Sequence, residues 1–352
     1  MDFSDTIINW YHHHKRELPW RNSRNPYIIW LSEIILQQTR VNQGLPYFYR
    51  FVETYPSVRE LANAPENDVL RLWQGLGYYS RARNMLKTAH MIMEKHQGIF
   101  PTEYDQLLQL KGIGSYTAAA ISSFCVDEPH AVLDGNVFRV LSRFFGIDIP
   151  INSSTGKKIF SDTAYSLLNK KHAGLHNQAI MEFGALQCKP QNPNCEQCPL
   201  SSQCVALKNE LVKKLPVKTK KISVKKRYIY YFVVTNNNRL LINQRTDKDI
   251  WANMYDFPSV ETEQPCNPEE LLTNNPLNSL FNPPIEVTHY SNVYRHQLTH
   301  QSLFIFFIHF HSPSNEFSPL AKQWQWCTEE EFNLLPKPKI IFEYLRVIHN
   351  LL

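Results

Sequence analysis

Apolar residues recur every three or four positions from residue 1 to about residue 207, which is the period of one face of an α-helix. Proline and glycine interrupt this pattern at intervals, where one helix is expected to end and the next to begin. The period is clearest in residues 26–39, 67–76, 80–96, 116–126 and 136–146. This half of the chain is predicted to be almost wholly helical.

The pattern changes after this half. Residues 227–235, 239–245 and 302–311 are rich in β-branched and aromatic residues and partly alternate between apolar and polar side chains, which predicts strands. Residues 343–352 return to helical spacing. The C-terminal part is therefore predicted to mix strands with at least one helix.

We expect two domains, 1–207 and 228–352, joined by a basic linker. Residues 208–227 contain eight lysines and one arginine against a single glutamate. Such a run is typical both of a solvated tether and of a segment that contacts phosphates, and the sequence leaves the two open. The predicted fold class is mainly α, followed by a smaller α/β domain.

The chain has 352 residues, a formal net charge of +5 and a pI near 8.7. This mild excess of basic residues favours a polyanionic partner without requiring one. The longest apolar run, residues 303–308, has only the length of a strand, and no early apolar segment ends in a cleavage site. Neither a membrane span nor a secretion signal is expected, and we predict a cytoplasmic protein.

Four cysteines stand within seventeen residues of one another, namely Cys188, Cys195, Cys198 and Cys204. Without a secretion signal, a metal or cluster site is favoured over disulfides. Zinc sites usually pair two CxxC-like knuckles, whereas this proline-containing loop has a single CxxC, so an iron-sulfur cluster is favoured over zinc. Because the loop ends a long helical domain, a structural cluster is a better interpretation than an electron carrier.

Residues 110–121 place Gly112 and Gly114 in a tight turn directly before an alanine-rich helix. Backbone N–H groups at such a turn and helix start form an anion site, and a DNA phosphate is a suitable anion. An ordinary turn between helices has the same composition, because a GxG pair alone is a weak signal. Both interpretations stand at this level.

Two carboxylates are candidates for chemistry. Glu33 lies in a predicted helix whose other residues are nearly all apolar, so it is either paired and structural or desolvated with a raised pKa, as a general acid requires. Asp134 stands just before a helix that is predicted to begin near Asn136, which is the usual place of an N-cap. A cap and a catalytic group can be the same residue.

Five motifs in order resemble those of the helix-hairpin-helix DNA glycosylases with an iron-sulfur cluster, and within them the MutY-type adenine glycosylases. They are LSEIILQQT, GLGYYSRARN, LKGIGSYTAAAI, LDGNVFRVLSR and the cysteine loop, and the similarity covers residues 1 to about 225. The resemblance implies a six-helix barrel with a cluster subdomain. It also implies a [4Fe-4S] cluster on the four cysteines and a cluster loop that presents basic side chains to DNA.

The resemblance implies roles for residues around the base as well. Gln38 and Tyr78 match positions that wedge into the gap left when adenine is extruded from the duplex. Each is equally compatible with an ordinary role, as a polar residue on a helix surface or as a packed aromatic. The positions that match the adenine pocket are Trp20, Arg21, Leu36 and Gln178.

In this family, Glu33 would protonate N7 of the flipped adenine and make the base a better leaving group. Asp134 would stabilise or briefly capture the oxocarbenium ion of the sugar, with Asn136 and Tyr116 orienting the groups, and water would complete the hydrolysis. Bifunctional relatives carry a lysine at the position of Tyr116, whose amine attacks the sugar. The tyrosine therefore predicts a monofunctional enzyme.

Residues 228–352 resemble the Nudix-like domain that reads 8-oxoguanine in MutY-type enzymes. The sequence does not supply the glycine- and glutamate-rich metal-binding helix of Nudix hydrolases, so pyrophosphatase activity is not expected. Many members read the lesion with a Phe-Ser-His loop, whereas this chain has Leu298, Thr299 and His300. The hydroxyl and imidazole donors remain, the aromatic ring does not, and His296 is a second candidate for the imidazole.

The sequence thus predicts a monomeric, monofunctional DNA glycosylase that removes adenine opposite 8-oxoguanine or guanine from double-stranded DNA at the bacterial nucleoid. Three alternatives remain: an endonuclease III-like glycosylase and lyase, an iron-sulfur redox protein, and a noncatalytic DNA-binding module. Tyr116 disfavours the first alternative, and the candidate carboxylates disfavour the second. Replacing Glu33 by glutamine separates an enzyme from the third.

Overall fold

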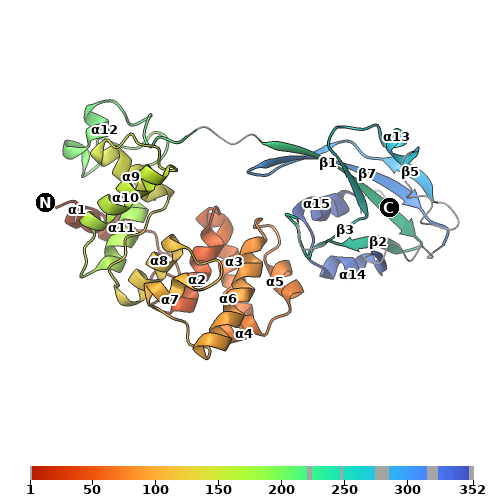
Figure 1. Cartoon of the computed structure of the whole chain (residues 1–352), viewed down its shortest axis with the longest axis horizontal. Helices are drawn as coiled ribbons and strands as arrows, with labels where there is room; N and C mark the ends of the chain where they lie inside the picture. The colour runs from red at the N-terminus through yellow and green to blue at the C-terminus, as the bar shows by residue number, and fades with distance from the viewer. Residues whose placement is uncertain (1, 220–223, 246–248, 274–284, 315–323, 349–352) are drawn as a thin grey trace. The chain divides into compact units, whose positions relative to one another are not determined.

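The computed structural model of the chain divides into two compact units, which are described separately (Figure 1). Unit 1 comprises Met1–Ala64 with Asn84–Lys220, and unit 2 comprises Pro65–Arg83 with Lys221–Leu352. Within the part of the chain that the structure describes, no helix combines the length and the apolar character of a membrane span. The described residues are 2–219, 224–245, 249–273, 285–314 and 324–348.

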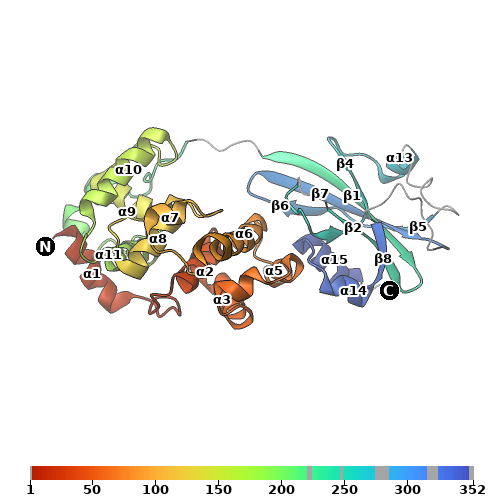
Figure 2. The ribbon, with the colours of Figure 1, turned by 60° about the horizontal axis from the view of Figure 1, so that its bottom comes forward.

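Unit 1 is helical, as the spacing of its apolar residues predicts. In Figures 1 and 2, α1, α9, α10 and α11 gather at one side of this unit, and α2 and α3 lie together at another. The two groups are joined by α8, which packs against both α2 and α11. The helices are α1 (Phe3–His14), α2 (Pro26–Leu36), α3 (Val41–Thr54), α4 (Val58–Ala62), α6 (Ser80–His96), α7 (Tyr104–Leu108), α8 (Ser115–Val126), α9 (Gly135–Phe145), α10 (Ser154–Leu167), α11 (Ala173–Leu186) and α12 (Val205–Lys208).

Local sequence signals fix where the two helices with candidate carboxylates begin. The Asn25 side chain accepts a hydrogen bond from the first turn of α2, and Pro26 occupies the first helical position. Asp134 caps α9, and Gly146 ends that helix with a left-handed φ of +72°. The start of each helix is therefore encoded next to it in the chain.

The core of unit 1 forms between α1, α8, α9 and α11. Its fully buried side chains include Ile7, Val137 and Leu141, and the rings of Trp10 and Phe183 meet edge to face at 5.0 Å. Burying a large apolar side chain contributes roughly 1.5–3 kcal/mol, so this packing holds α9 firmly against α11. The position of Asp134 at the start of α9 depends on that contact.

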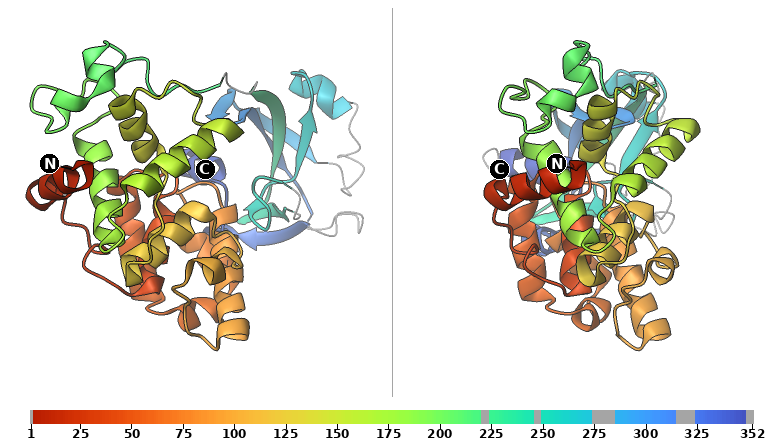
Figure 3. Two further views of the ribbon diagram at one scale, coloured as in Figure 1. Left: turned by 60° about the vertical axis from the view of Figure 1, so that its left-hand side comes forward. Right: turned by 90° about the vertical axis from the view of Figure 1, so that its left-hand side faces the viewer.

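Unit 2 contains a mixed sheet with the strand order β3-β2-β1-β7-β5, in which β4 pairs with β1, β6 with β7 and β8 with β2. β1 and β7 run parallel along their whole length (Figure 3). The strands are β1 (Lys225–Asn236), β2 (Arg239–Gln244), β3 (Tyr255–Asp256), β4 (Ser259–Thr262), β5 (Glu286–Tyr290), β6 (Tyr294–Gln297), β7 (Gln301–His311) and β8 (Trp324–Thr328), and the helices are α5 (Glu66–Leu72), α13 (Pro268–Thr273), α14 (Glu329–Leu334) and α15 (Lys339–Ile348).

The predicted strands 227–235, 239–245 and 302–311 correspond to β1, β2 and β7. The C-terminal helix begins at Lys339, four residues earlier than residue 343, where the sequence placed its start. Ile340 and Ile341 are buried, so packing against the sheet extends the apolar face toward the N-terminus of the helix. Residues 349–352 of the predicted helix lie outside the described residues.

A testable consequence concerns Gly184, where α11 approaches the start of α9. A Cβ at this position would lie 2.7 Å from Cβ of Asn136 and 2.9 Å from its carbonyl oxygen. We expect Gly184→Ala to force the helices apart and to lower the free energy of unfolding by about 1–3 kcal/mol, measured as a lower Tm. Gly135→Ala is the matched control, because a Cβ there meets nothing within 4 Å. Equal Tm values for the two variants would contradict this packing.

Candidate active site and cysteine centre

The hairpin between α7 and α8 requires glycine at position 112. The φ of Gly112 is +78°, and a Cβ there would lie 2.9 Å from Cβ of Asn84. Gly114 precedes α8 in an extended conformation, with open space where a Cβ would be. Gly112, Gly114 and Ser115 are exposed, so the N–H groups at the start of α8 are accessible to an anion.

Glu33 is a buried carboxyl, with 8% of its surface exposed. The hydroxyl of Tyr116, on α8, donates a hydrogen bond to Oε2 of Glu33 at 2.7 Å. Burial raises the pKa of Glu33 to about 7, the Tyr116 bond opposes this rise, and the charge of Asp134 adds to it. Of the two interpretations that the sequence left open for Glu33, the structure therefore has the desolvated carboxyl.

Asp134 is the N-cap of α9 and also acts electrostatically on Glu33. Its Oδ1 accepts the backbone N–H groups of Asn136 at 2.8 Å and Val137 at 2.7 Å, and its Oδ2 accepts the Asn136 side-chain amide at 2.7 Å. Burial raises the pKa of Asp134, whereas these hydrogen bonds act to lower it. Helix capping and a place beside a second carboxyl are thus combined in one residue.

The two carboxyl groups differ in the number of donors that they receive. Asp134 accepts three hydrogen bonds, whereas Glu33 accepts one from Tyr116. Since donated hydrogen bonds stabilise the ionised form, Glu33 is the carboxyl that more readily holds a proton and Asp134 the one that more readily carries the negative charge. An acid and an anion in one site suit the cleavage of a bond that leaves positive charge behind.

Two of the four predicted pocket residues are brought together by Tyr11, on α1. The Tyr11 hydroxyl donates to Oε1 of Gln178 at 2.7 Å, and the guanidinium of Arg21 lies 5.4 Å from the centre of the Tyr11 ring. Trp20 is buried and packs edge-on against another aromatic side chain. Leu36 is the half-buried last residue of α2.

Sequence reasoning missed the acid that holds Arg21 of this predicted pocket in place. Glu182, on α11, is 2% exposed and accepts hydrogen bonds from Arg16, at 2.6 and 2.8 Å, and from Arg21. Although burial acts to raise the pKa of Glu182, the bonds from the two arginines lower it to about 2. The signal was a single acid within the apolar run 179–186, the same pattern that singled out Glu33.

The two predicted wedge residues share an unusual backbone conformation. Gln38, which follows the end of α2, has a φ of +56°, and Tyr78, before α6, has a φ of +46°. A non-glycine residue in the left-handed region costs roughly 1–2 kcal/mol. Both side chains are exposed, so burial does not offset this cost. Six other non-glycine residues of the described chain share this conformation, so it does not by itself assign Gln38 and Tyr78 a role.

In unit 2, the residues Leu298, Thr299 and His300 form the turn between β6 and β7. Thr299 and His300 are exposed, and the Thr299 hydroxyl forms a hydrogen bond with the hydroxyl of Tyr78, which belongs to the same unit. The turn borders a cavity of about 480 Å³ that His296 and Trp251 also line.

A path of hydrogen bonds connects Asp134 to the cysteine loop. The amide of Asn136 donates to Asp134, and its oxygen accepts from Nη2 of Arg139 at 2.8 Å. Nε of the buried Arg139 donates to the carbonyl oxygen of Cys188 at 2.7 Å. The capped end of α9 and the first cysteine are therefore held by the same arginine.

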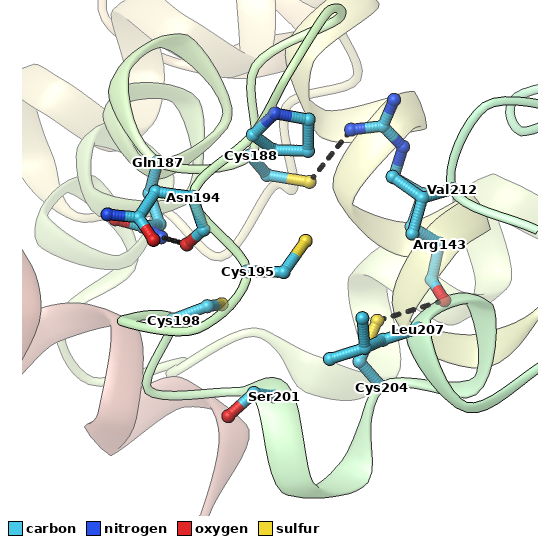
Figure 4. A pocket seen from close by; sticks show the side chains of 11 residues that line it. Arg143, Gln187, Cys188, Asn194, Cys195, Cys198, Ser201, Cys204, Leu207 and Val212 are labelled. Atoms are coloured by element: carbon cyan, nitrogen blue, oxygen red, sulfur yellow. Dashed lines mark hydrogen bonds between the residues drawn. The ribbon is translucent and has the colours of Figure 1, made fainter. Parts of the chain in front are cut away.

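The four cysteines line one small cavity, with their sulfurs directed toward a common centre (Figure 4). Arg143, on α9, donates to the Cys188 sulfur at 3.5 Å and to the carbonyl oxygen of Lys189 at 2.7 Å. Burial raises the pKa of Cys198 to about 11, so a bound metal is needed to hold the thiolate near neutral pH.

The donor set fits an iron-sulfur cluster better than a zinc ion. A zinc ion draws four sulfurs to within about 4 Å of one another, given Zn–S bonds of about 2.3 Å. Among the described residues, no group of three or more histidine, cysteine or acidic side chains is arranged to hold a single metal ion. Four cysteines around one shared cavity can instead each bind one of the four irons of a [4Fe-4S] cluster.

The cluster loop departs from the expected row of basic side chains. Between Cys188 and Cys204 the only basic residue is Lys189, and Glu196 offsets its charge. A strong electrostatic contact with a polyanion therefore cannot come from this loop alone.

Three family models match the chain. Residues 31–159 match the HhH-GPD superfamily base excision DNA repair protein, residues 188–204 match the iron-sulfur binding domain of endonuclease III, and residues 230–347 match the NUDIX domain. The predicted fold class and the predicted iron-sulfur site are confirmed.

Curated relatives share most of the chain. An adenine DNA glycosylase of Buchnera aphidicola subsp. Schizaphis graminum is 41% identical over 265 residues, which cover 74% of this chain and 76% of the relative. A second, of Buchnera aphidicola subsp. Baizongia pistaciae, is 38% identical over 308 residues, covering 86% and 84%. The adenine DNA glycosylase of Homo sapiens is 38% identical over 213 residues, covering 58% and 39%.

Solved structures resemble the helical part. A thermostable thymine-DNA glycosylase aligns with a TM-score of 0.55 at 27% identity, covering 59% of this chain and 95% of the other. A non-covalent endonuclease III-DNA complex aligns with a TM-score of 0.51 at 24% identity, covering 59% and 94%.

A testable consequence of the buried Glu33 is a pH-dependent stability. Because the folded state raises the pKa of Glu33 from 4.5 to about 7, it binds this proton more tightly than the unfolded chain does. Its contribution therefore favours the fold below pH 4.5 and is lost as the pH rises to about 7, by roughly 3 kcal/mol in total. We expect Glu33→Gln to gain stability relative to the unsubstituted protein between pH 5 and pH 8, measured by chemical denaturation.

The exposed Glu53→Gln serves as the control for this comparison, since it also removes one carboxylate from unit 1. If the stability difference between Glu33→Gln and the unsubstituted protein changes over this pH range no more than the difference for Glu53→Gln does, Glu33 does not hold a proton in the way that its burial indicates.

Proposed function

This chain belongs to the adenine DNA glycosylase family, and on that premise we propose that it removes adenine opposite 8-oxoguanine or guanine in double-stranded DNA by hydrolysis, without cutting the strand. The observation that carries this proposal is the buried Glu33, which receives the Tyr116 hydroxyl and shares its site with Asp134. Duplex DNA as the partner is supported by the similarity to the fold of an endonuclease III-DNA complex and by the exposed hairpin at Gly112.

Glu33 acts as the general acid. The Tyr116 bond occupies its Oε2, so the proton is carried on Oε1, free to pass to N7 of a flipped adenine. With a pKa of about 7, a large fraction of the carboxyl is protonated near neutral pH. Protonation makes adenine a better leaving group. The burial of Glu33 therefore promotes departure of the base.

Asp134 stabilises the positive charge that develops on the sugar. Its three hydrogen bonds keep the carboxylate ionised and fixed, while Asn136 orients it from both backbone and side chain. Water then adds to the sugar and leaves an abasic site. The [4Fe-4S] cluster, when bound to the four cysteines, supplies order to their loop, and Arg139 connects that loop to Asn136.

Tyr116 is the reason to expect no strand cleavage. A lyase needs an amine at this point of the hairpin to form a Schiff base with the sugar. Tyr116 has a phenol there, and burial raises its pKa well above the ordinary value, so it remains a neutral donor to Glu33. The nearby Lys111 is exposed on the other side of the turn.

The turn of Leu298, Thr299 and His300 reads the lesion. Its exposed hydroxyl and imidazole supply donors and acceptors for the edge of an oxidised guanine. With leucine in place of an aromatic residue, stacking contributes less to the recognition, and a smaller preference for 8-oxoguanine over guanine is expected than with a phenylalanine at this position.

The proposal is tested by single-turnover assays on end-labelled duplexes that contain adenine opposite 8-oxoguanine, adenine opposite guanine, or thymine glycol. We expect strand breaks only after alkali, fastest for adenine opposite 8-oxoguanine, and at least a hundredfold slower base removal by Glu33→Gln, since general acid catalysis contributes roughly 10²–10⁴-fold. Retained DNA binding by Glu33→Gln is the control. Breaks without alkali, or a preference for thymine glycol, would place the chain among the lyases.

A second prediction concerns the wedge residues. Glycine adopts left-handed backbone without strain, so Gln38→Gly and Tyr78→Gly should fold normally. We expect Tyr78→Gly to lower the rate of base removal from a duplex by about tenfold, because a ring that stacks on bases contributes roughly 1–3 kcal/mol. The loss should be smaller on single-stranded substrate, where no gap has to be filled. An equal loss on both substrates would argue against the wedge.

A further inference from the structure

Arg227, on β1, is the buried centre of a network of charged and polar side chains in unit 2. Only 9% of its surface is exposed. Nε and Nη2 donate to the two oxygens of Glu261 at 2.7 and 2.6 Å, and Nη1 and Nη2 donate to those of Asp249 at 3.0 Å each. Nη1 also donates to Oε1 of Gln301 at 3.0 Å. These five bonds match the five N–H groups that a guanidinium carries.

The bond to Gln301 connects this network to the turn of Leu298, Thr299 and His300. Gln301 is the first residue of β7 and directly follows His300. Its carbonyl oxygen accepts the N–H of Leu298 at 2.8 Å, which closes the turn, and the backbone N–H of Lys225 donates to the carbonyl of His300 at 3.0 Å. The same stretch of β1 therefore fixes the turn through its backbone and through the Arg227 side chain.

The bond to Asp249 reaches a second wall of the same cavity. Asp249 also accepts the N–H of Ile250 at 2.7 Å and a hydrogen bond from Arg245, whose guanidinium lies 5.6 Å from the centre of the Trp251 ring. Asp249, Trp251 and the turn all line the cavity of about 480 Å³. One side chain thus sets the spacing between two of its walls.

The geometry points to Arg227 as a positioning residue for reading the base opposite adenine, acting through Gln301 on the turn of Leu298, Thr299 and His300. This inference rests on the proposed lesion-reading function of that turn. The two carboxylates already balance the charge of Arg227, so the additional bond to Gln301 serves the placement of the turn. A lysine has three donors on a single nitrogen and cannot serve three partners in this planar arrangement.

The test compares single-turnover rates of the full, cluster-bound chain on adenine opposite 8-oxoguanine and on adenine opposite guanine. We expect Arg227→Gln to lower the rate on the 8-oxoguanine substrate and to leave the rate on the guanine substrate unchanged, so that the ratio of the two rates falls by about tenfold. This factor corresponds to the loss of roughly one hydrogen bond to a charged group. Lys226→Gln, which removes one positive charge from an exposed position on the same strand, is the matched control and should leave the ratio unchanged.

Gln301→Ala keeps the test valid if Arg227→Gln does not fold, because it leaves both carboxylate pairs intact. It should lower the ratio as much as Arg227→Gln does, and the double variant should lower it no further, since both changes remove one interaction. A ratio unchanged in Gln301→Ala, or equal losses on both substrates, would overturn the inference, since a merely structural role predicts the latter.

Thr299→Ala and His300→Ala separate this inference from the proposed function on which it rests. If these variants lose the preference for 8-oxoguanine while Gln301→Ala and Arg227→Gln keep it, the turn reads the lesion and Arg227 does not position it. If Thr299→Ala and His300→Ala keep the preference, the lesion-reading function of the turn is itself overturned, and the inference with it.

Discussion

A carboxyl group that is kept out of water is the constraint around which unit 1 is organised. Glu33 is 8% exposed on a helix that is otherwise almost wholly apolar, and burial disfavours its ionised form. Two groups answer this constraint from different elements: Tyr116 donates a single hydrogen bond, and Asp134 contributes negative charge. Burial and the charge of Asp134 favour the protonated form of Glu33 near neutral pH, and the Tyr116 bond opposes them only in part.

Helix α9 links the acid site to the cluster loop. Asp134 caps its first turn, and Arg139 and Arg143 follow on one face, four residues apart. Arg139 donates to the carbonyl oxygen of Cys188 and also to the side chain of Asn136 beside the cap. Arg143 donates to the carbonyl oxygen of Lys189. The order of the cysteine loop and the orientation of the Asp134 carboxylate thus depend on the same helix, and Gly184 allows α11 to pack close to its start.

Unit 2 uses its acidic residues differently. Asp249, Asp256 and Glu261 all form ion pairs with Arg227 or Arg245. Carboxylates that are neutralised by arginine are poor ligands for a divalent cation, because binding the metal would require breaking those pairs. The fold resembles that of a Nudix domain, and these ion pairs hold its strands and turns in place.

Local sequence alone determined much of this protein. The spacing of apolar residues predicted that unit 1 is helical and placed the strands β1, β2 and β7, because amphipathic period and turn chemistry are written within a few residues. The spacing of the four cysteines favoured a cluster over zinc, and the apolar surroundings of Glu33 marked it as an unusual acid. The position of Asp134 before α9 predicted its cap, since capping involves only neighbouring backbone groups.

Contacts between distant residues were decided only by the tertiary structure. The bond between Glu33 and Tyr116 spans 83 positions in sequence, and those from Arg16 and Arg21 to Glu182 span more than 160. Nothing local identifies such partners, because an arginine in a loop looks the same whether it faces water or a buried acid. The pKa of a group depends on these surroundings, so the sequence could nominate Glu33 as an acid, and only the burial of α2 in the folded chain could raise its pKa.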